Sequence, residues 1–345
     1  MRSSVMPTSS RGDGHPSPTA VSAVGLRKSY GERLVLDGID LHIPAGSVFA
    51  LLGPNGAGKT TAVKILSTLI TADAGDLHVG GHSLAADPQA VRAAIGVTGQ
   101  FSAVDGLITG EENMLLMADL HHLSRSEGRQ VAAELLERFD LVEAAKKPAS
   151  TYSGGMKRRL DLAMTLMGSP RIIFLDEPTT GLDPRSRHNM WDIIRGLVAD
   201  GVTVFLTTQY LEEADELADR IAVLNDGKIA AEGTAEELKR LIPGGHIRLR
   251  FTDPVAYQSA ADALREVTLP HSQLRSSGGT PIDEALSLSI PSDGSQRELR
   301  SILDWLDSVG IEADELTVHT PDLDDVFFAL TGPADVPNQP KETVR

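Results

Sequence analysis

The sequence contains no cysteine, which excludes disulfide bonds and thiolate metal sites and suits a reducing cytoplasm. It also lacks any run of about 18 consecutive apolar residues, so no segment is predicted to span a membrane as a helix. The first 20 residues are rich in Ser, Pro and Gly and have no apolar stretch long enough for a secretory signal, which predicts a disordered leader. Any work at a membrane therefore requires a partner protein.

Positive charge is scarce as well. The chain has 32 Lys and Arg against 48 Asp and Glu, a formal net charge of -16. Binding to a phosphate backbone needs a basic footprint, so this balance argues against nucleic acid as the main ligand.

The length of 345 residues and the apolar pattern predict two folded domains. Residues 23–52 predict short strands, residues 109–139 have helical spacing, and strands alternate with helices over residues 171–226. That alternation indicates a largely parallel sheet covered by helices. The pattern of predicted strands and helices changes near Pro243, where a shorter α+β pattern begins. The predicted segments are a leader (1–20), a first domain (21–243), a small α+β domain (244–331) and an unstructured tail (332–345).

A glycine-rich loop between a strand and a helix matches the phosphate-loop pattern G-x-x-x-x-G-K-[ST]. Its glycines let backbone N–H groups converge on phosphate oxygens at a helix N-terminus. Lys59 is expected to contact the β- and γ-phosphates, and Thr60 to offer its hydroxyl to Mg²⁺. The alternative, a turn that binds nothing, is disfavoured because the flanking strand and helix are those that the motif requires. The predicted ATP-binding residues here are Gly53, Pro54, Asn55, Gly56, Ala57, Gly58, Lys59, Thr60 and Thr61.

The segment IIFLDE, residues 172–177, predicts a buried strand that ends in two acids. Such a strand places Asp176 at its carboxyl end beside the phosphate loop, where doubly wound sheets bind ligands. Asp176 is expected to hold Mg²⁺, and Glu177 to polarise the attacking water. Taken alone, the two acids are also compatible with the N-terminal cap of the following helix.

The segment YSGGMK, residues 152–157, precedes a helical stretch and resembles the signature motif of ABC ATPases, with Tyr152 where Leu is commoner. A turn in which Ser153 caps the helix is the simpler alternative, and both descriptions can hold. The resemblance implies that Ser153, Gly154 and Gly155 bind the γ-phosphate held by another subunit's phosphate loop. It therefore implies a head-to-tail homodimer that encloses two ATP molecules.

Four further positions match family motifs. Tyr30 resembles the aromatic residue that stacks on adenine, although a half-buried strand tyrosine is an alternative. Gln100 resembles the Q-loop glutamine that touches Mg²⁺ and the attacking water. Asp183 in TTGLDP resembles the D-loop acid that communicates across the dimer. Gln209 stands where most ABC ATPases have a histidine that contacts the γ-phosphate, which implies slower hydrolysis or a greater dependence on Glu177.

The acids that follow Gln209 need a separate interpretation. Glu212, Glu213 and Asp215 lie in a short helical stretch. A solvated helix face is the preferred interpretation, and metal binding the alternative.

Residues 23–331 as a whole resemble the ATP-binding subunits of daunorubicin/doxorubicin-type drug-resistance exporters. The segments GQFSAVDGLITGEEN, TTQYLEEADELADRIAVL and LDDVFFALTG carry this resemblance. It implies an α/β fold of the P-loop ABC type, with a mostly parallel core sheet, antiparallel strands and a helical subdomain at about 101–168. The small C-terminal α+β domain follows it.

The resemblance implies an ATPase that uses ATP and Mg²⁺, with Glu177, Gln209 and Lys59 as catalytic residues and Thr60, Gln100 and Asp176 at the metal. The expected partners of the chain are a second copy of itself and a separate multi-helix permease. Binding to this permease is expected to place the chain on the cytoplasmic face of the membrane. The expected cargo is a drug or another hydrophobic compound. An importer ATPase is one alternative. A soluble ABC protein acting on nucleic acid is a weaker one, because the chain has one phosphate loop and no long insertion.

Overall fold

The computed structural model describes residues 18–100, 102–241, 245–266, 286–292, 295–319 and 322–331. The chain divides into two compact units, Met1–Glu232 and Gly233–Arg345. The predicted boundary at Pro243, most of the leader and the tail after Thr331 lie outside the described residues. Thr19 and Ala20, assigned to the leader from sequence, belong to the first strand.

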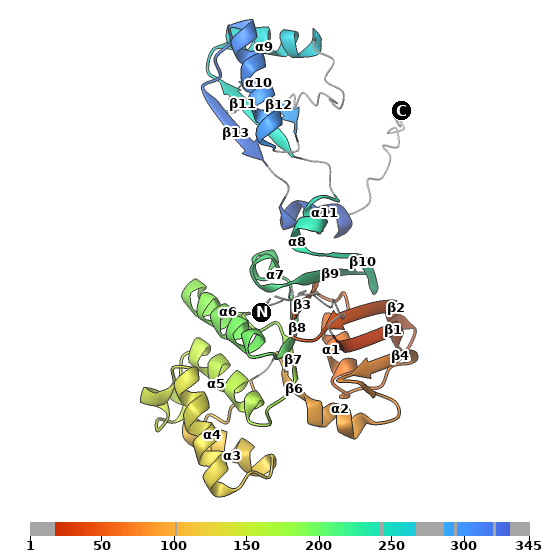
Figure 1. Ribbon diagram of the computed structural model, residues 1–345, viewed down its shortest axis with the longest axis vertical. Coiled ribbons are helices and arrows are strands. Elements are labelled where there is room, and N and C mark those ends of the chain that lie inside the picture. The colour runs from red at the N-terminus through yellow and green to blue at the C-terminus, as the bar shows by residue number, and fades with distance from the viewer. Residues whose placement is uncertain are drawn as a thin grey trace, which may run out of the picture. The chain divides into compact units, whose positions relative to one another are not determined.

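The first unit is built on a six-stranded sheet with the order β10-β9-β3-β8-β7-β6 (Figure 1). Strands β3, β6, β7, β8 and β9 pair in parallel. Every residue of β3, β7 and β8 is buried, as expected for apolar strands covered on both faces. The strand bounds are β3 Val48–Leu52, β6 Ile95–Thr98, β7 Ile172–Asp176, β8 Thr203–Thr208, β9 Arg220–Asn225 and β10 Lys228–Gly233.

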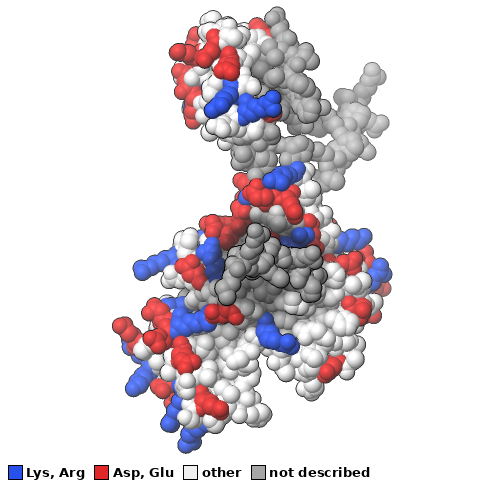
Figure 2. Space-filling model, viewed as in Figure 1, with Lys and Arg blue, Asp and Glu red and all other residues white. Residues whose placement is uncertain are grey.

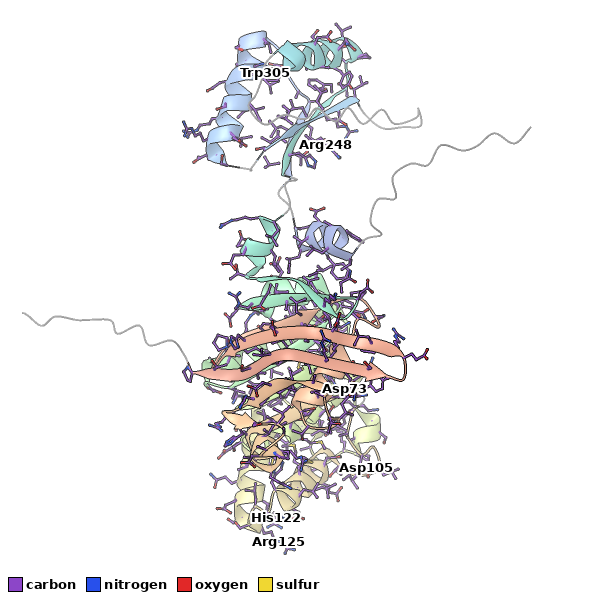
Figure 3. The ribbon with its side chains drawn as sticks, turned by 90° about the vertical axis from the view of Figure 1, so that its right-hand side faces the viewer. Asp73, Asp105, His122, Arg125, Arg248 and Trp305 are labelled. Atoms are coloured by element: carbon purple, nitrogen blue, oxygen red, sulfur yellow. The ribbon has the colours of Figure 1, made fainter. Side chains whose placement is uncertain are left out.

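A second, antiparallel sheet has the order β2-β1-β4-β5, and Figure 3 looks onto it, with Asp73 labelled just ahead of β4. Its strands are β1 Thr19–Tyr30, β2 Arg33–Pro44, β4 Ala74–Val79 and β5 His82–Ser83. Its apolar side chains join those of β3 and of helix α1, Lys59–Leu66, in one core. That core holds the beginning of α1 close to the sheet.

The helices on the other flank of the six-stranded sheet include α5 and α6 (Figure 1). The helical pattern predicted over residues 109–139 forms α3 and α4, and each begins with a capping box, at Thr109 with Glu112 and at Ser124 with Glu127. The bounds are α2 Pro88–Ala94, α3 Gly110–Leu120, α4 Arg125–Arg138, α5 Gly154–Leu166, α6 Pro184–Ala199 and α7 Leu211–Leu217, with 3-10 turns η1 Val142–Ala144 and η2 Ala149–Thr151.

The second unit has its own core around a three-stranded antiparallel sheet with the order β12-β11-β13. Strand β11 alternates between buried and outward-facing residues, so Ile247, Leu249 and Phe251 pack inward while Arg248, labelled in Figure 3, is exposed. The bounds are α8 Ala235–Lys239, β11 His246–Phe251, α9 Pro254–Glu266, β12 Leu286–Pro291, α10 Gln296–Val309, β13 Glu315–His319 and α11 Leu323–Thr331.

Two surface properties bear on function. Within the part of the chain that the structure describes, none of the helices combines the length and the hydrophobicity that a membrane span requires. Figure 2 shows acidic and basic side chains interspersed over the helical region of the first unit on the face in view, without a continuous basic patch there. This distribution agrees with the acidic composition.

Candidate functional site

Four predicted site segments begin at the same edge of the core sheet. The phosphate loop follows β3, Gln100 follows β6, Glu177 follows β7 and Gln209 follows β8. Because these strands pair in parallel, their carboxyl ends meet along one edge. Ligands of open α/β sheets bind at such an edge.

The phosphate loop depends on glycine at two positions. Gly58 caps α1 with a φ of 113°, and a Cβ there would lie 2.7 Å from Leu36 Cδ2. A Cβ on Gly53 would collide with the carbonyl oxygen of Leu224. The loop therefore keeps a shape that side chains at these positions would prevent.

Lys59 is buried at the start of α1 and points back along the loop. Its Nζ donates to the carbonyl oxygens of Gly53 at 2.8 Å and Pro54 at 3.2 Å. It also lies 3.7 Å from Oε1 of Glu177. Burial lowers the pKa of Lys59, and the carboxylates of Glu177 and Asp176 act against that shift. The ammonium group is thus surrounded by oxygen atoms beside the loop.

Asp176 lies where the loop helix and two strands meet. Its Oδ1 accepts from the hydroxyl of Thr60 at 3.2 Å and from the hydroxyl of Thr207, on β8, at 2.6 Å. The hydroxyl and the carboxylate are hard oxygen donors of the kind that Mg²⁺ prefers. No group of three or more His, Cys, Asp or Glu within the described ranges is arranged to hold a metal.

Glu177 has an unusual backbone. Its φ of 49° lies in the left-handed region, which non-glycine residues seldom adopt. Its N–H donates to both the carbonyl and hydroxyl oxygens of Thr207, each at 3.1 Å. Its Oε2 accepts from the Thr180 hydroxyl at 3.2 Å. The carboxylate of Glu177 is therefore held next to Lys59 at the edge of the sheet.

Ser153 caps α5, and its Oγ accepts from the N–H of Met156 at 3.2 Å. A Cβ on Gly155 would lie 2.7 Å from Ser186 Oγ, and Asp183 binds that same serine through Oδ1 and Oδ2. The Ser186 side chain lowers the pKa of Asp183. The signature turn and the D-loop acid therefore adjoin, and in the part of one chain that the structure describes no hydrogen bond or ion pair joins Ser153, Gly154 or Gly155 to the phosphate loop.

The remaining predicted residues have partly or largely exposed side chains. Tyr30, at the end of β1, is 51% exposed, and Lys28 Nζ lies 5.7 Å from the centroid of its ring. Gln100 is exposed and Gln209 is partly buried. The structure brings Lys59, Thr60, Asp176 and Glu177 into direct contact through the hydrogen bonds and the ion pair described above.

One expectation is wrong. Glu213 was assigned to a solvated helix face, but only 1% of it is exposed. Its Oε1 accepts from the indole N–H of Trp191 at 3.3 Å because α7 packs its inner side against α6. Burial raises the pKa of Glu213. Its exposed neighbour Glu212 pairs with Arg187, as a surface residue does.

Sequence reasoning also missed Arg158. This residue of α5 is nearly buried and reaches backbone carbonyls after both β6 and β7. The available signal was the spacing of Arg158 and Asp161, two opposite charges one helical turn apart.

Comparisons with known proteins agree with this geometry. A family model described as "ABC transporter" matches residues 36–180. The daunorubicin resistance ATP-binding protein DrrA3 of Streptomyces coeruleorubidus is 46% identical over 314 residues, 91% of this chain and 96% of that protein. The Nod factor export ATP-binding protein I of Paraburkholderia xenovorans is 40% identical over 244 residues, 70% of this chain and 80% of that protein. A solved structure of the ATP-binding subunit of an ABC transporter matches with a TM-score of 0.59 and 27% identity, covering 65% of this chain and 93% of that one.

Proposed function

Because the chain belongs to the ATP-binding subunits of ABC transporters, in the daunorubicin/doxorubicin resistance group, we propose that it drives drug export as a head-to-tail homodimer. ATP hydrolysis is the activity of this family. We propose in addition which residues hydrolyse ATP, in which assembly they act and which compound is transported.

The observation that carries the proposal is the contact of four side chains at the sheet edge. Thr60 and Asp176 lie 3.2 Å apart, and Lys59 and Glu177 lie 3.7 Å apart. Phosphoryl transfer to water requires a loop that can cradle phosphates, a cation, a metal-binding pair and a carboxylate that can accept a proton.

In the proposed reaction, Glu177 accepts a proton from water as the water oxygen bonds to the γ-phosphorus and the bond to the β-bridging oxygen breaks. Lys59 leaves its two loop carbonyls for the β- and γ-phosphate oxygens and balances their charge. Thr60 and Asp176, with Gln100, would hold Mg²⁺, which would neutralise the negative charge that develops on the phosphate oxygens. Gln209 donates a neutral hydrogen bond to the γ-phosphate.

The homodimer is proposed because Ser153–Gly155 resemble the signature motif, which in ABC ATPases binds the ATP held by the other subunit's phosphate loop. In this arrangement a second copy of the chain supplies Ser153–Gly155 to each ATP. Tyr30 stacks on adenine in the same site. Each chain then contributes two different halves to two sites.

Export and cargo are proposed from the relatives. One is named for daunorubicin resistance and another for Nod factor export, which favours export over import. A separate membrane protein is the expected conduit, with this chain bound at its cytoplasmic face and an amphipathic drug as cargo. Closure of the dimer on ATP would switch the conduit outward, and hydrolysis would reset it.

The test of the site is Glu177→Gln. It should lower the ATPase rate by about 10²-fold or more, since the base is lost, while ATP binding persists. Size-exclusion chromatography with ATP and Mg²⁺ should show a trapped dimer. Glu212→Gln, the same change at an exposed carboxylate, is the control and should hydrolyse ATP normally. Wild-type turnover in Glu177→Gln would remove Glu177 as the base.

The test of cargo starts from the membrane protein that copurifies with the full chain. Vesicles containing both proteins should accumulate daunorubicin in an ATP-dependent way, and the Glu177→Gln chain should abolish this uptake. Copurification with a substrate-binding component, without daunorubicin transport, would favour an importer instead.

A further inference from the structure

Arg158 is a nearly buried cation whose N–H groups donate to backbone carbonyls in two separate segments of the chain. Its Nη1 donates to the carbonyl of Gly99 at 2.7 Å and its Nε to the carbonyl of Pro178 at 2.9 Å. Its Nη2 donates to the carbonyls of Asp176 at 3.1 Å and Glu177 at 3.3 Å. The side chain is 11% exposed. One guanidinium thus binds three successive carbonyls, beginning at the last residue of β7, and one carbonyl after β6.

These three successive carbonyls surround the left-handed residue of the site. Glu177 has a φ of 49°, a conformation that costs free energy for any residue with a side chain. Such a conformation persists only where the surroundings hold it. Arg158 binds carbonyls on both sides of this φ, and the Glu177 N–H is bound to Thr207. The guanidinium is therefore part of what fixes the direction of the Glu177 carboxylate.

Asp161 extends the contact to the other side of Gln100. Its Oδ2 lies 3.6 Å from Arg158 Nη1, and its Oδ1 accepts from the N–H of Ala103 at 3.1 Å. Gly99 and Ala103 lie on either side of Gln100 in the sequence, so helix α5 binds this segment at both ends. Burial raises the pKa of Asp161, and the positive charge of Arg158 acts against that rise. Arg158 and Asp161 therefore neutralise each other's charge in a mostly buried environment.

We propose that Arg158 is a positioning residue for hydrolysis, through which the signature helix α5 sets Glu177 and the Gln100 segment together. The proposal rests on the roles proposed above for those two residues. Arginine suits this task because its rigid, planar group carries five donors, whereas the lysine ammonium is a point charge with three. Arg158 contacts no reacting atom itself and acts through the backbone it binds.

The test compares Arg158→Met, Arg158→Lys and the control Arg159→Met in the full chain. Arg159 also binds backbone carbonyls, but those of Phe139 and Asp140 at the end of α4. Arg158→Met should lower kcat by about tenfold to a hundredfold, as small misplacements of catalytic groups do, while KM and nucleotide Kd change less than about threefold. Arg158→Lys should recover part of kcat. Arg159→Met should lower the unfolding temperature and leave kcat within about twofold.

Two measurements keep the proposal separate from folding and from the role of Glu177. Hydrogen exchange in Arg158→Lys should accelerate at the amides of Glu177 and Ala103, which a folded but loosened site would show. In a Glu177→Gln background, Arg158→Lys should cause little further loss, because the two act as one unit. Independent, multiplying losses would overturn the proposal, and so would a wild-type kcat in Arg158→Met. A slow Glu177→Gln beside an unaffected Arg158→Met would reject the positioning role alone and leave the proposed base intact.

Discussion

Glu213 is a buried carboxyl group four residues after Gln209, the residue proposed to contact the γ-phosphate. It belongs to α7, the helix that begins two residues after Gln209, and its Oε1 accepts from Trp191. Its Oε2 is buried without a hydrogen-bond partner in the described part of the structure. A buried, unpaired carboxylate oxygen is costly, and burial accordingly raises the pKa of Glu213. The first unit thus contains a buried group whose protonation is linked to folding.

The sign of that linkage gives a prediction. The folded-state pKa of Glu213 lies above the unfolded value of about 4.3, so its contribution to stability is complete below that pH and is lost as pH rises through the folded pKa. Glu213→Gln keeps an acceptor for Trp191 and removes the ionisation. The variant should therefore gain stability relative to the wild type as pH rises from the unfolded pKa through the higher folded pKa. Urea unfolding across this range measures it.

The control for this prediction is Glu212→Gln, which changes an exposed neighbour on the same helix. It should follow the pH dependence of the wild type within about 0.5 kcal/mol. If the free energies of unfolding of Glu213→Gln and of the wild type differed by the same amount at every pH, Glu213 would have the same pKa in the folded and unfolded states.

Single residues also show where sequence reasoning ends. The phosphate loop was predictable because its glycines have a spacing that few other structures need, and Gly53 and Gly58 indeed leave no room for a Cβ. Arg158 and Glu213 were not predictable because charge in a helix usually indicates a solvated face. What buries them is packing against β6, β7 and α6, which are separate elements of the tertiary fold.

At the scale of elements, the buried parallel strands were the easiest to predict. IIFLD and TVFLTT are apolar runs that end at the motifs, and both form fully buried strands. The antiparallel sheet was harder. Its strand β4 was not predicted, and it pairs with β1 across more than 50 residues, with Val21 opposite Val79. Gly75 lies in β4 with a φ of 118°, and a glycine at this place in the sequence predicts a turn rather than a strand.

Helix α5 shows how one element serves two purposes. Its first residue follows the Ser153 cap, so the signature turn presents polar groups at a helix N-terminus, where anions bind favourably. One turn further along, Arg158 and Asp161 bind the backbone after β6 and β7. Both descriptions of YSGGMK from the sequence, a helix cap and an ATP-binding signature, are compatible with this geometry, and the cap is what the hydrogen bonds show.

At the scale of the whole molecule, each unit has its own hydrophobic core, and the proposed catalytic residues all belong to the first unit. One chain nevertheless carries only half of each proposed site, the phosphate loop with Lys59 and Glu177 on one side and Ser153 on the other. Mixing two inactive variants distinguishes this arrangement from a site completed within one chain. Head-to-tail pairing predicts recovery only when the two defects lie in different halves.

The informative pair is Lys59→Ala with Ser153→Asp. Aspartate caps a helix as well as serine does, so α5 should persist, while its charge repels the partner's γ-phosphate. Each variant alone should lack ATPase activity. A mixed dimer then has one site with both defects and one intact site, and an equal mixture should recover about a quarter of the wild-type rate by random pairing. Lys59→Ala mixed with Glu177→Gln has both defects in the same half, so neither site is intact and no activity should return. ATPase activity in the second mixture, or no ATPase activity in the first, would contradict a site shared between two chains.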